Sequence, residues 1–461
     1  MYERLSGRRH WTEVLRLREL QWRPAAELEG RALARLRPLL EHAATHVPHY
    51  RGLFGSTGLA PKDVRSLADL AAVPITTKAA LRAGFPTRTT ADNLPSTRRW
   101  RSRTSGSTGF PFEFYTDRAA ADNWHASYLF FLEWAGVALR DTRFVIAAPS
   151  YGMYRGNTPG PPALVPAARR LIFGEQTFYL AGVDLTASAL KARIERLPDG
   201  RQYFIQIYPS YAARLARGLL TEGLELPVYP KAVIGVTETM TAANAAAIAS
   251  AFRCRIVNHY STWEVLHLAQ SCPDNPELLH VNSERAIVRI VRDDGSSAPP
   301  GERGRVLLTD LSNFVMPFIN YDIGDLAVMG PPCPCGRGFP TLRSLEGRVG
   351  ETISTPAGKV VAPGALERLL TFVCQIVPYI WEYQAVQVAA DAVVLRVVPT
   401  PKFSEEFARK LRRDLEEFMG PGVTVVIEPV DHILLEPSGK RLIIKPLGSA
   451  DGPGSSDQSP R

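Results

Sequence analysis

One hydroxyl-rich run, residues 103–111, has a composition that could bind a phosphate group. Its two glycines allow the backbone to turn sharply, and its N–H groups and hydroxyls could surround a polyphosphate. It is not a Walker A loop, because no Gly-Lys-Ser/Thr sequence follows. A flexible Ser/Gly loop has the same composition and is the alternative. The candidate phosphate-binding residues are Thr104, Ser105, Gly106, Ser107, Thr108 and Gly109.

A second candidate site is formed by cysteine and histidine. The chain has five cysteines, an odd count that argues against a disulfide scaffold. Three thiols and one imidazole suit tetrahedral zinc in a reducing compartment, and no open coordination position is indicated, so zinc would be structural. Free thiols on loops are the alternative, because the paired Cys-x-x-Cys spacing is absent. The predicted zinc ligands are Cys272, His280, Cys333 and Cys335, which leaves Cys254 and Cys374 unassigned.

The elements that must position these residues alternate between short apolar runs and helical segments from about residue 143 to 315. This alternation predicts parallel strands joined by crossover helices, hence an α/β core. Two helices are expected earlier, within residues 11–45, and another begins at Thr76-Thr77-Lys78. The expected core strands are residues 144–148, 203–207, 232–236 and 255–257, with a helix over 240–251.

The pattern changes after about residue 347. A helix near Gly364 and a strongly amphipathic helix are mixed with three strands, which predicts a separate α+β domain with a largely antiparallel sheet. The expected elements are strands 383–388, 392–398 and 423–427 and the helix 405–419. We therefore predict three parts: a large domain at 1–346, a small mobile domain at 347–447, and a disordered Gly/Ser/Pro-rich tail at 448–461.

Residues 104–111 resemble the phosphate loop of the adenylate-forming superfamily, and four further segments are similar to motifs of that family in the family's order. Phe112-Glu113 stands where many members carry a lysine, which resembles the phenylacetate–CoA ligase and capsule-biosynthesis branch. Segments 46–51 and 74–78 resemble the same branch, so the likeness covers about residues 30–446. The four further segments are 258–264 (similar to Tyr-Gly-x-Thr-Glu), 320–325 (Tyr-Arg-Thr-Gly-Asp), 347–351 (the Gly-Arg-x-Asp-Asp hinge) and 436–441 (the Pro-x-x-Gly-Lys loop).

The resemblance implies a large multi-layer α/β domain, a small α+β domain on a hinge, and a nucleotide site between them. It implies that the phosphate loop holds the β- and γ-phosphates of ATP, that Tyr260 packs on adenine and that Glu264 holds Mg²⁺, since a carboxylate beside phosphates needs a divalent cation. Asp325 and Arg348 would bind ribose, because a carboxylate can accept from two vicinal hydroxyls. Lys440 would reach the reacting carboxylate and the α-phosphate, where charge builds up.

The remaining predicted site residues lie beside these. Thr262 would face the phosphates and would complete a catalytic set with the lysine and the glutamate. Ser261 stands where the family carries glycine. Residues 236–238 occupy the position of an adenine-contacting turn whose two glycines are absent here, and Glu238 is expected at the nucleotide. Only nine of the 54 basic residues are lysines, so a lysine in such a loop stands out.

The composition limits the classes of partner that this protein can have. The 461 residues carry a formal net charge of +8, and no stretch approaches the ~18 apolar residues of a membrane span. The first five residues lack the apolar region of a secretory signal. The arginines are scattered along the chain, so the charge indicates no nucleic-acid stripe and favours at most a small anionic ligand. We expect a cytoplasmic protein with neither nucleic acid nor a membrane as partner.

The predicted function is ATP-dependent activation of a carboxylic acid to an acyl-adenylate, with release of pyrophosphate, followed by transfer to CoA. No covalent enzyme nucleophile is required, because positioning and electrostatics suffice. An amine or other nitrogen acceptor is the first alternative, and a non-catalytic nucleotide or ligand sensor on the same fold is the second. The acid pocket is expected near Tyr151, Tyr208, Val236 and His259, which favours an aryl or hydrophobic acid.

Overall fold

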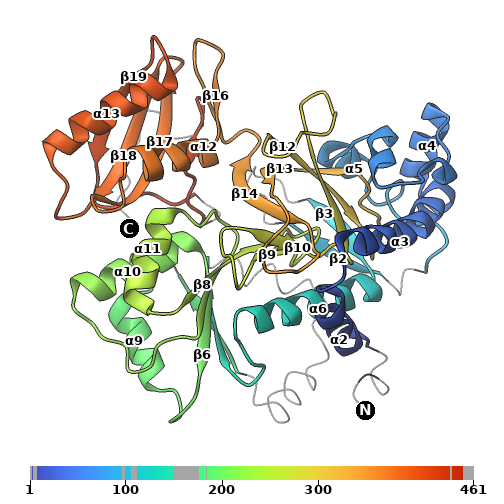
Figure 1. Ribbon diagram of the computed structural model, residues 1–461, viewed down its shortest axis with the longest axis horizontal. Helices are drawn as coiled ribbons and strands as arrows, with labels where there is room; N and C mark the ends of the chain where they lie inside the picture. The colour runs from blue at the N-terminus through green and yellow to red at the C-terminus, as the bar shows by residue number, and fades with distance from the viewer. Residues whose placement is uncertain are drawn as a thin grey trace.

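The computed structural model describes residues 3, 8–95, 99–104, 112–148, 176–182, 184–436 and 439–449. A large part is built on a twelve-stranded sheet and a small part on a four-stranded sheet (Figure 1). The predicted combination of a large α/β domain with a smaller α+β domain is confirmed. No helix among the described residues is both long and apolar enough to cross a membrane.

The N-terminal segment consists mainly of helices and contains one short strand, β1 (Thr76–Thr77). Its first two helices confirm the two predicted within residues 11–45, and the longer one buries residues such as Leu36 and Leu40 at helical spacing. The predicted helix start at residues 76–78 is also confirmed, because Thr77 Oγ1 accepts from the Ala80 N–H at 3.1 Å and caps the helix. The elements are α2 (His10–Leu20), α3 (Ala25–His46), α4 (Pro48–Thr57), β1 (Thr76–Thr77) and α5 (Lys78–Gly84).

The first half of the large sheet is parallel, with spatial order β5-β4-β6-β7-β8. All four predicted core strands are present. The carboxyl ends of parallel strands share one edge, where ligands bind in open α/β sheets. The strands are β4 (Thr142–Ala147), β5 (Thr177–Ala181), β6 (Tyr203–Ile207), β7 (Ala232–Gly235) and β8 (Arg255–Tyr260), and the helices are α6 (Arg118–Trp134), α9 (Ala187–Glu195), α10 (Pro209–Thr221) and α11 (Ala242–Phe252).

The second half of the large sheet is antiparallel and begins where β8 pairs with β9. The expectation of strand–helix alternation up to residue 315 is wrong beyond β8, because the following strands are joined without helices. The strands are β9 (Ala269–Ser271), β10 (Leu279–Val281), β11 (Ala286–Val291), β12 (Arg303–Asp310), β13 (Tyr321–Met329) and β14 (Thr341–Arg348), and a separate hairpin pairs β2 (Trp100–Arg103) with β3 (Glu113–Thr116).

One pairing joins the N-terminal segment to this sheet. β1 lies parallel to β13, with Thr76 opposite Tyr321 and Thr77 opposite Asp322. The side chain that follows β1 is therefore held at the beginning of β13.

The small domain has spatial strand order β19-β18-β17-β20. The prediction of a largely antiparallel sheet is wrong: β17 and β18 are antiparallel, but β18–β19 and β17–β20 are parallel. The reason is that α13 crosses between β18 and β19, and such a crossover returns the chain in the same direction. The elements are β15 (Ile353–Ser354), β16 (Val360–Val361), α12 (Pro363–Arg368), β17 (Ile380–Ala389), β18 (Ala392–Pro399), α13 (Glu405–Met419), β19 (Thr424–Pro429) and β20 (Ile444–Lys445).

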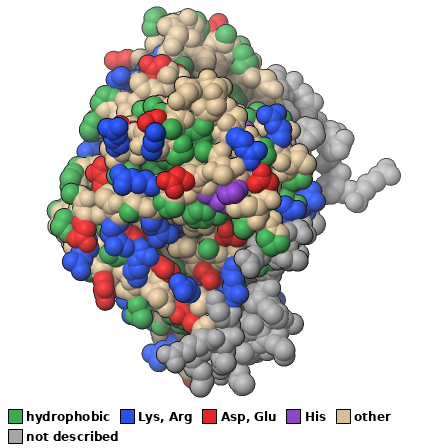
Figure 2. Space-filling model, turned by 90° about the vertical axis from the view of Figure 1, so that its right-hand side faces the viewer, with side chains coloured by type: hydrophobic (Ala, Val, Ile, Leu, Met, Phe, Trp, Pro, Cys, Tyr) green, Lys and Arg blue, Asp and Glu red, His purple; other side chains and the backbone are tan. Residues whose placement is uncertain are grey.

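Two further predictions concern boundaries. The predicted domain boundary after residue 346 falls within β14, which ends at Arg348. The predicted disordered tail lies outside the described residues from residue 450 onward. On the face shown in Figure 2, the Lys and Arg side chains are interspersed with Asp and Glu.

Candidate functional site

Glu264 lies in the loop after β8, and its side chain is almost completely buried, with the residue 2% exposed. Its Oε1 accepts a 2.9 Å hydrogen bond from the Tyr321 hydroxyl and lies 3.0 Å from Lys78 Nζ. A buried carboxylate without a cation is strongly disfavoured, and Lys78 supplies that cation here. Burial raises the pKa of the Tyr321 hydroxyl, so it stays protonated and donates to the carboxylate. Neither Lys78 nor Tyr321 is among the predicted site residues, although Lys78 lies in segment 74–78, whose sequence resembles the phenylacetate–CoA ligase branch.

Asp325 joins two other predicted residues. Its Oδ2 accepts from the Tyr260 hydroxyl at 2.7 Å, and its Oδ1 accepts from Arg348 Nε at 3.0 Å. Asp325 and Arg348 are directly opposite each other on β13 and β14. The negative charge of Asp325 raises the pKa of Arg348, and burial raises that of Tyr260 well above its usual value. The structure therefore brings together three of the four side chains predicted to contact the nucleoside: Tyr260, Asp325 and Arg348.

The hydroxyls of Thr262 and Ser261 shape the loop that carries Glu264. Thr262 Oγ1 accepts from the Val265 N–H at 3.0 Å, and Ser261 Oγ accepts from the His267 N–H at 3.0 Å. These are local side-chain-to-backbone bonds of the kind that stabilise turns. Their described partners are within the loop, and the predicted role of Thr262 toward phosphate stays a prediction.

The ends of the predicted phosphate loop are held together. The Thr104 N–H donates to Phe112 O at 2.9 Å, and the Phe112 N–H donates to Thr104 Oγ1 at 3.0 Å. Lys78 Nζ lies 5.7 Å from the centre of the Phe112 ring, so this end of the loop adjoins the Lys78–Glu264 pair. The other loop residues predicted at the phosphates lie outside the described residues: Ser105, Gly106, Ser107, Thr108 and Gly109.

The lysine loop of the small domain docks on the large domain through a glycine. The Tyr211 hydroxyl, from α10, donates to Gly439 O at 2.7 Å. Gly439 has φ +77°, and a Cβ at that position would lie 2.3 Å from Ala148 Cβ. Both the left-handed backbone and the close approach require glycine. The adjacent Lys440 is thereby carried to the edge of the large domain.

Lys440 is partly buried, and its charge interacts with those of Arg348 and Asp325. Burial lowers the pKa of Lys440, the Arg348 cation lowers it further, and the carboxylates of Glu238, Glu351 and Asp325 oppose this. These interactions place the lysine in one electrostatic group with the predicted ribose-binding residues. Glu351 was not selected from the sequence, and nothing in its pattern distinguished it from a surface acid.

Glu238 connects this loop to the large domain. Its Oε1 accepts from the Arg441 N–H at 2.7 Å, and its carboxylate also accepts from the Ser210 N–H at 3.0 Å. Thr237, just before it, has φ +77°, a conformation that is strained for a β-branched residue. The backbone here adopts the conformation that glycine favours even though glycine is absent. The predicted contact of Glu238 with adenine stays a prediction.

The residues predicted around the acid lie at the carboxyl edge of the parallel strands. The register places Gln206 opposite Ile234 and Ile234 opposite Val257, so Gln206, Val236 and His259 share one face of the sheet. Tyr208 stacks on Tyr211 with 5.4 Å between ring centres. The fourth predicted residue, Tyr151, lies outside the described residues.

Several polar side chains on this face are hydrogen-bonded to one another or to neighbouring side chains. His259 Nδ1 is 3.0 Å from Gln270 Oε1, and its Nε2 is 2.9 Å from His267 Nδ1. Burial lowers the pKa of His259 to about 4, so it is neutral at physiological pH. Arg143 Nη2 donates to Gln206 Oε1 at 2.5 Å on the same side. This hydrogen-bonded network was not visible in the sequence, because its members come from four separate segments.

The four predicted zinc ligands lie together. All four ligand atoms of Cys272, His280, Cys333 and Cys335 are within 4.8 Å of one another. Cys272 Sγ is 3.8 Å from Cys333 Sγ, and Cys335 Sγ is 3.4 Å from His280 Nε2. The His280 Nδ1–H donates to Phe339 O at 3.1 Å, which leaves Nε2 facing the sulfurs.

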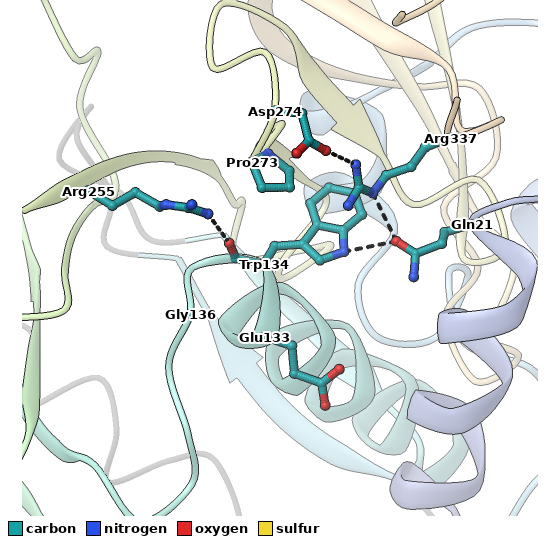
Figure 3. A pocket seen from close by; sticks show the side chains of 8 residues that line it. All are labelled: Gln21, Glu133, Trp134, Gly136, Arg255, Pro273, Asp274 and Arg337. Atoms are coloured by element: carbon teal, nitrogen blue, oxygen red, sulfur yellow. Dashed lines mark hydrogen bonds and ion pairs between the residues drawn. The ribbon is translucent and has the colours of Figure 1, made fainter. Parts of the chain in front are cut away.

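A cavity of about 380 Å³ opens beside this cluster (Figure 3). Its polar groups are already engaged: Arg337 bonds Asp274 at 2.5 Å and Gln21 at 3.0 Å, and Arg255 bonds Trp134 O at 2.7 Å. Trp134 also packs edge-on against His280, with 5.6 Å between ring centres. The cavity wall therefore supports the cysteine cluster and is separate from the nucleotide-facing residues.

Comparison with known proteins places this geometry in context. No family model matches the chain. The chain is 25% identical over 420 residues to the phenylacetate–coenzyme A ligase of Aromatoleum evansii, covering 87% of this chain and 91% of that protein. It is 26% identical over 409 residues to the phenylacetate–coenzyme A ligase of Thermus thermophilus, covering 86% and 87%. The predicted resemblance to this branch is confirmed.

The fold comparison agrees. A crystal structure of 2-hydroxyisobutyryl-CoA ligase in the postadenylation state superposes with a TM-score of 0.73 at 22% identity, covering 92% of this chain and 91% of that one. The thioesterification-state structure of the same enzyme gives 0.58, covering 93% and 91%. The chain therefore has the fold of these ligases, and it superposes better on the postadenylation structure.

Proposed function

We propose that this chain, a homologue of phenylacetate–CoA ligases, is an ATP-dependent acid–CoA ligase. In the first step a carboxylate oxygen attacks the α-phosphorus of ATP and the bond to pyrophosphate breaks. In the second, the CoA sulfur attacks the acyl carbon, AMP leaves and the thiol proton is released. The observation that carries the proposal is the hydrogen-bonded group of Tyr260, Asp325 and Arg348, against which the docked loop of the small domain carries Lys440.

Each side chain has a role in the first step. Lys440 would stabilise the charge that develops at the α-phosphorus, and Tyr260, Asp325 and Arg348 would hold the nucleoside in place. Thr104 and residues 105–109 would surround the β- and γ-phosphates, with Thr262 facing them. Glu238 would position the lysine loop as well as border adenine.

Glu264 fits the role of magnesium ligand. Its carboxylate is buried and already has a cation at 3.0 Å, so its surroundings accommodate positive charge. Bound there, Mg²⁺ would neutralise charge on the phosphate oxygens.

The docked small domain suits adenylation. Tyr211 and Glu238 hold the lysine loop against the large domain, and both bonds must break for that loop to leave. We expect residues 347–351 to act as the pivot, with Gly350 already at φ +93°. Departure of the loop would give CoA access to the acyl-adenylate.

The acid we propose is aromatic or hydrophobic and carries a hydrogen-bonding substituent. The aryl component follows the aromatic residue Tyr208 beside the pocket. We infer the substituent from the network of Arg143, Gln206, His259 and His267 on the same face, whose members could exchange a bond to one another for a bond to the acid.

Zinc at the cysteine cluster is part of the proposal. Two sulfurs on tetrahedral zinc are about 3.8 Å apart when each Zn–S bond is about 2.3 Å, and the observed Cys272–Cys333 separation is 3.8 Å. The zinc would be structural, since all four positions are filled by protein. Thiolate ligands suit a reducing compartment, which supports a cytoplasmic location. Metal analysis of the purified protein should find about one zinc atom per chain. Fewer than about one zinc atom per ten chains, in a protein whose three cysteines of the cluster are reduced and unmodified, would remove zinc from the proposal.

The test of function is ATP–pyrophosphate exchange across a panel of carboxylic acids, followed by product analysis with CoA and with amines. We expect exchange with substituted aryl acids and thioester formation only with CoA. Amide formation with CoA-independent turnover would establish the amine alternative. Absence of exchange with every acid, in a protein that still binds ATP, would establish the sensor alternative.

A further inference from the structure

We propose that Lys78 is the phosphate-binding cation of this chain, and that it exchanges Glu264 for the β- and γ-phosphates when ATP binds. The inference rests on the proposed function and adds a phosphate-binding residue to it. It assigns a role to Lys78 in segment 74–78, to which the roles above give none.

The backbone holds Lys78 in this place. β1 pairs with the beginning of β13, so the residue after β1 is directed to the same end of the sheet as Tyr321. Thr77 caps α5 and fixes the first turn, in which Lys78 is the first residue. Among the ion pairs of the described residues, Lys78–Glu264 is the one that joins a lysine to a predicted site residue.

The Glu264 carboxylate would face a different cation in each state, Lys78 without nucleotide and magnesium with it. With no nucleotide bound, its buried carboxylate needs a cation, and Lys78 Nζ at 3.0 Å meets that need. With Mg·ATP bound, the same carboxylate is the proposed magnesium ligand, and Mg²⁺ binds oxygen at about 2.0–2.1 Å. An ammonium and a divalent cation on one carboxylate repel each other, so magnesium held by Glu264 would favour movement of Lys78 toward the phosphates.

The described end of the predicted phosphate loop lies close to Lys78, so phosphates bound there would be within its reach. Its end at Phe112 lies under Lys78, at 5.7 Å from Nζ to the ring centre. Phe112-Glu113 stands where a loop lysine would be, so residues 104–113 contain no lysine of their own. The side chain of Lys78 is 29% exposed, whereas that of Glu264 is 3% exposed. The lysine is therefore the partner that can move, and its flexible stem permits a short displacement.

The test is direct binding of ATP and AMP, measured by calorimetry without acid substrate, in EDTA and then with Mg²⁺. Lys78→Met should weaken ATP binding about 10- to 100-fold, the range for loss of a charged hydrogen bond, and should leave AMP binding unchanged. Lys62→Met is the matched control, because Lys62 is an exposed lysine in the same N-terminal segment. This variant should bind ATP and AMP with the affinity of the parent protein.

The exchange makes a second, opposite prediction. Glu264→Gln releases Lys78 and should tighten magnesium-free ATP binding, while the double variant should behave like Lys78→Met. A purely structural ion pair predicts weakening in both single variants and equal losses for ATP and AMP, and either result would overturn the inference.

Folding is controlled separately. Lys78→Arg keeps the charge and should retain ATP binding within about threefold; if Lys78→Met does not fold, the Arg and Gln variants decide the question. A parent protein that binds no adenine nucleotide would overturn the proposed function itself. Undiminished ATP binding by Lys78→Met, in a protein that performs exchange, would overturn only the role of Lys78.

Discussion

The cysteine cluster and the nucleotide-facing site both assemble side chains that are distant in sequence, but they differ in how their charges are balanced. In the cluster, the four ligand atoms face one another within 4.8 Å, and the nearby Arg337 is itself bonded to Asp274. In the nucleotide-facing site, each central carboxylate already has a protein cation: Lys78 on Glu264 and Arg348 on Asp325. The first arrangement suits a ligand that stays, and the second suits ligands that come and go.

The physical basis lies in what replaces the ligand when it is absent. Three thiols and an imidazole gain little from one another, so the proposed zinc would supply the cohesion of the cluster. The lysine and the arginine are partly solvent-exposed, so each could leave its buried carboxylate when a bound ligand supplies replacement charge. Four measurements test this contrast.

The largest effect is expected for Lys440→Ala. Removing a charge that acts in the transition state should lower kcat/KM for ATP–pyrophosphate exchange about 10²- to 10³-fold, with little change in thermal stability. Steady-state exchange kinetics and a melting curve measure the two quantities. Lys402→Ala, an exposed lysine of the same domain, is the control. Undiminished exchange in Lys440→Ala would remove the lysine from the first step.

The cysteine cluster should respond in the opposite way. Cys333→Ser should lower the free energy of unfolding on the order of 3 kcal/mol and release the zinc, because metal binding contributes directly to folding. Denaturant unfolding and metal analysis measure this. ATP affinity per folded molecule should be unchanged, and Cys254→Ser, outside the cluster, should have parent stability. Normal stability in Cys333→Ser together with loss of the metal would show that the cluster is not structural.

The pH dependence of adenylation should follow Lys440. Its pKa is lowered by burial and by Arg348, so the ammonium is present below that pKa and is lost as pH rises through it. Exchange activity should therefore fall on the alkaline side with a midpoint below 10.5, the ordinary lysine value. In Lys440→Arg the fall should move to higher pH, since arginine stays charged. The same alkaline limb in both enzymes would assign it to another group.

The smallest effect is expected at Thr237. Its positive φ is strained for a β-branched residue, so Thr237→Gly should raise the free energy of unfolding by about 1 kcal/mol. Thr237→Ala keeps a Cβ and should gain less. Denaturant titration measures both. An unchanged free energy of unfolding in Thr237→Gly would show that the positive φ of Thr237 carries no energetic cost.

Much of the fold followed from local patterns. Parallel strands such as β6 and helices such as α13 have strong apolar periodicity, and they were predicted nearly to the residue. The antiparallel half and β20 were not, because hairpin order and a two-residue strand are set by tertiary pairing rather than by periodicity.

The site was predicted unevenly for a related reason. Asp325, Arg348 and Lys440 occur in segments with recognisable neighbours, so their types could be noted in sequence. Lys78 depends on β1 pairing with β13, and the His259–His267 network depends on a loop that turns back on its strand. Such contacts leave no local signal, because they are created by long-range register.

The two-residue strand β1 has a practical consequence for anyone cutting this chain. A fragment that begins after α5 would leave Glu264 with no ammonium beside it and would uncover the start of β13. On the proposed role of Lys78, residues 8–95 added back as a separate polypeptide would have to dock before the remainder could bind ATP with full affinity. The segment that carries β1 and Lys78 would then be part of the ATP-binding unit, so a tag or fusion partner would be better attached at the other terminus.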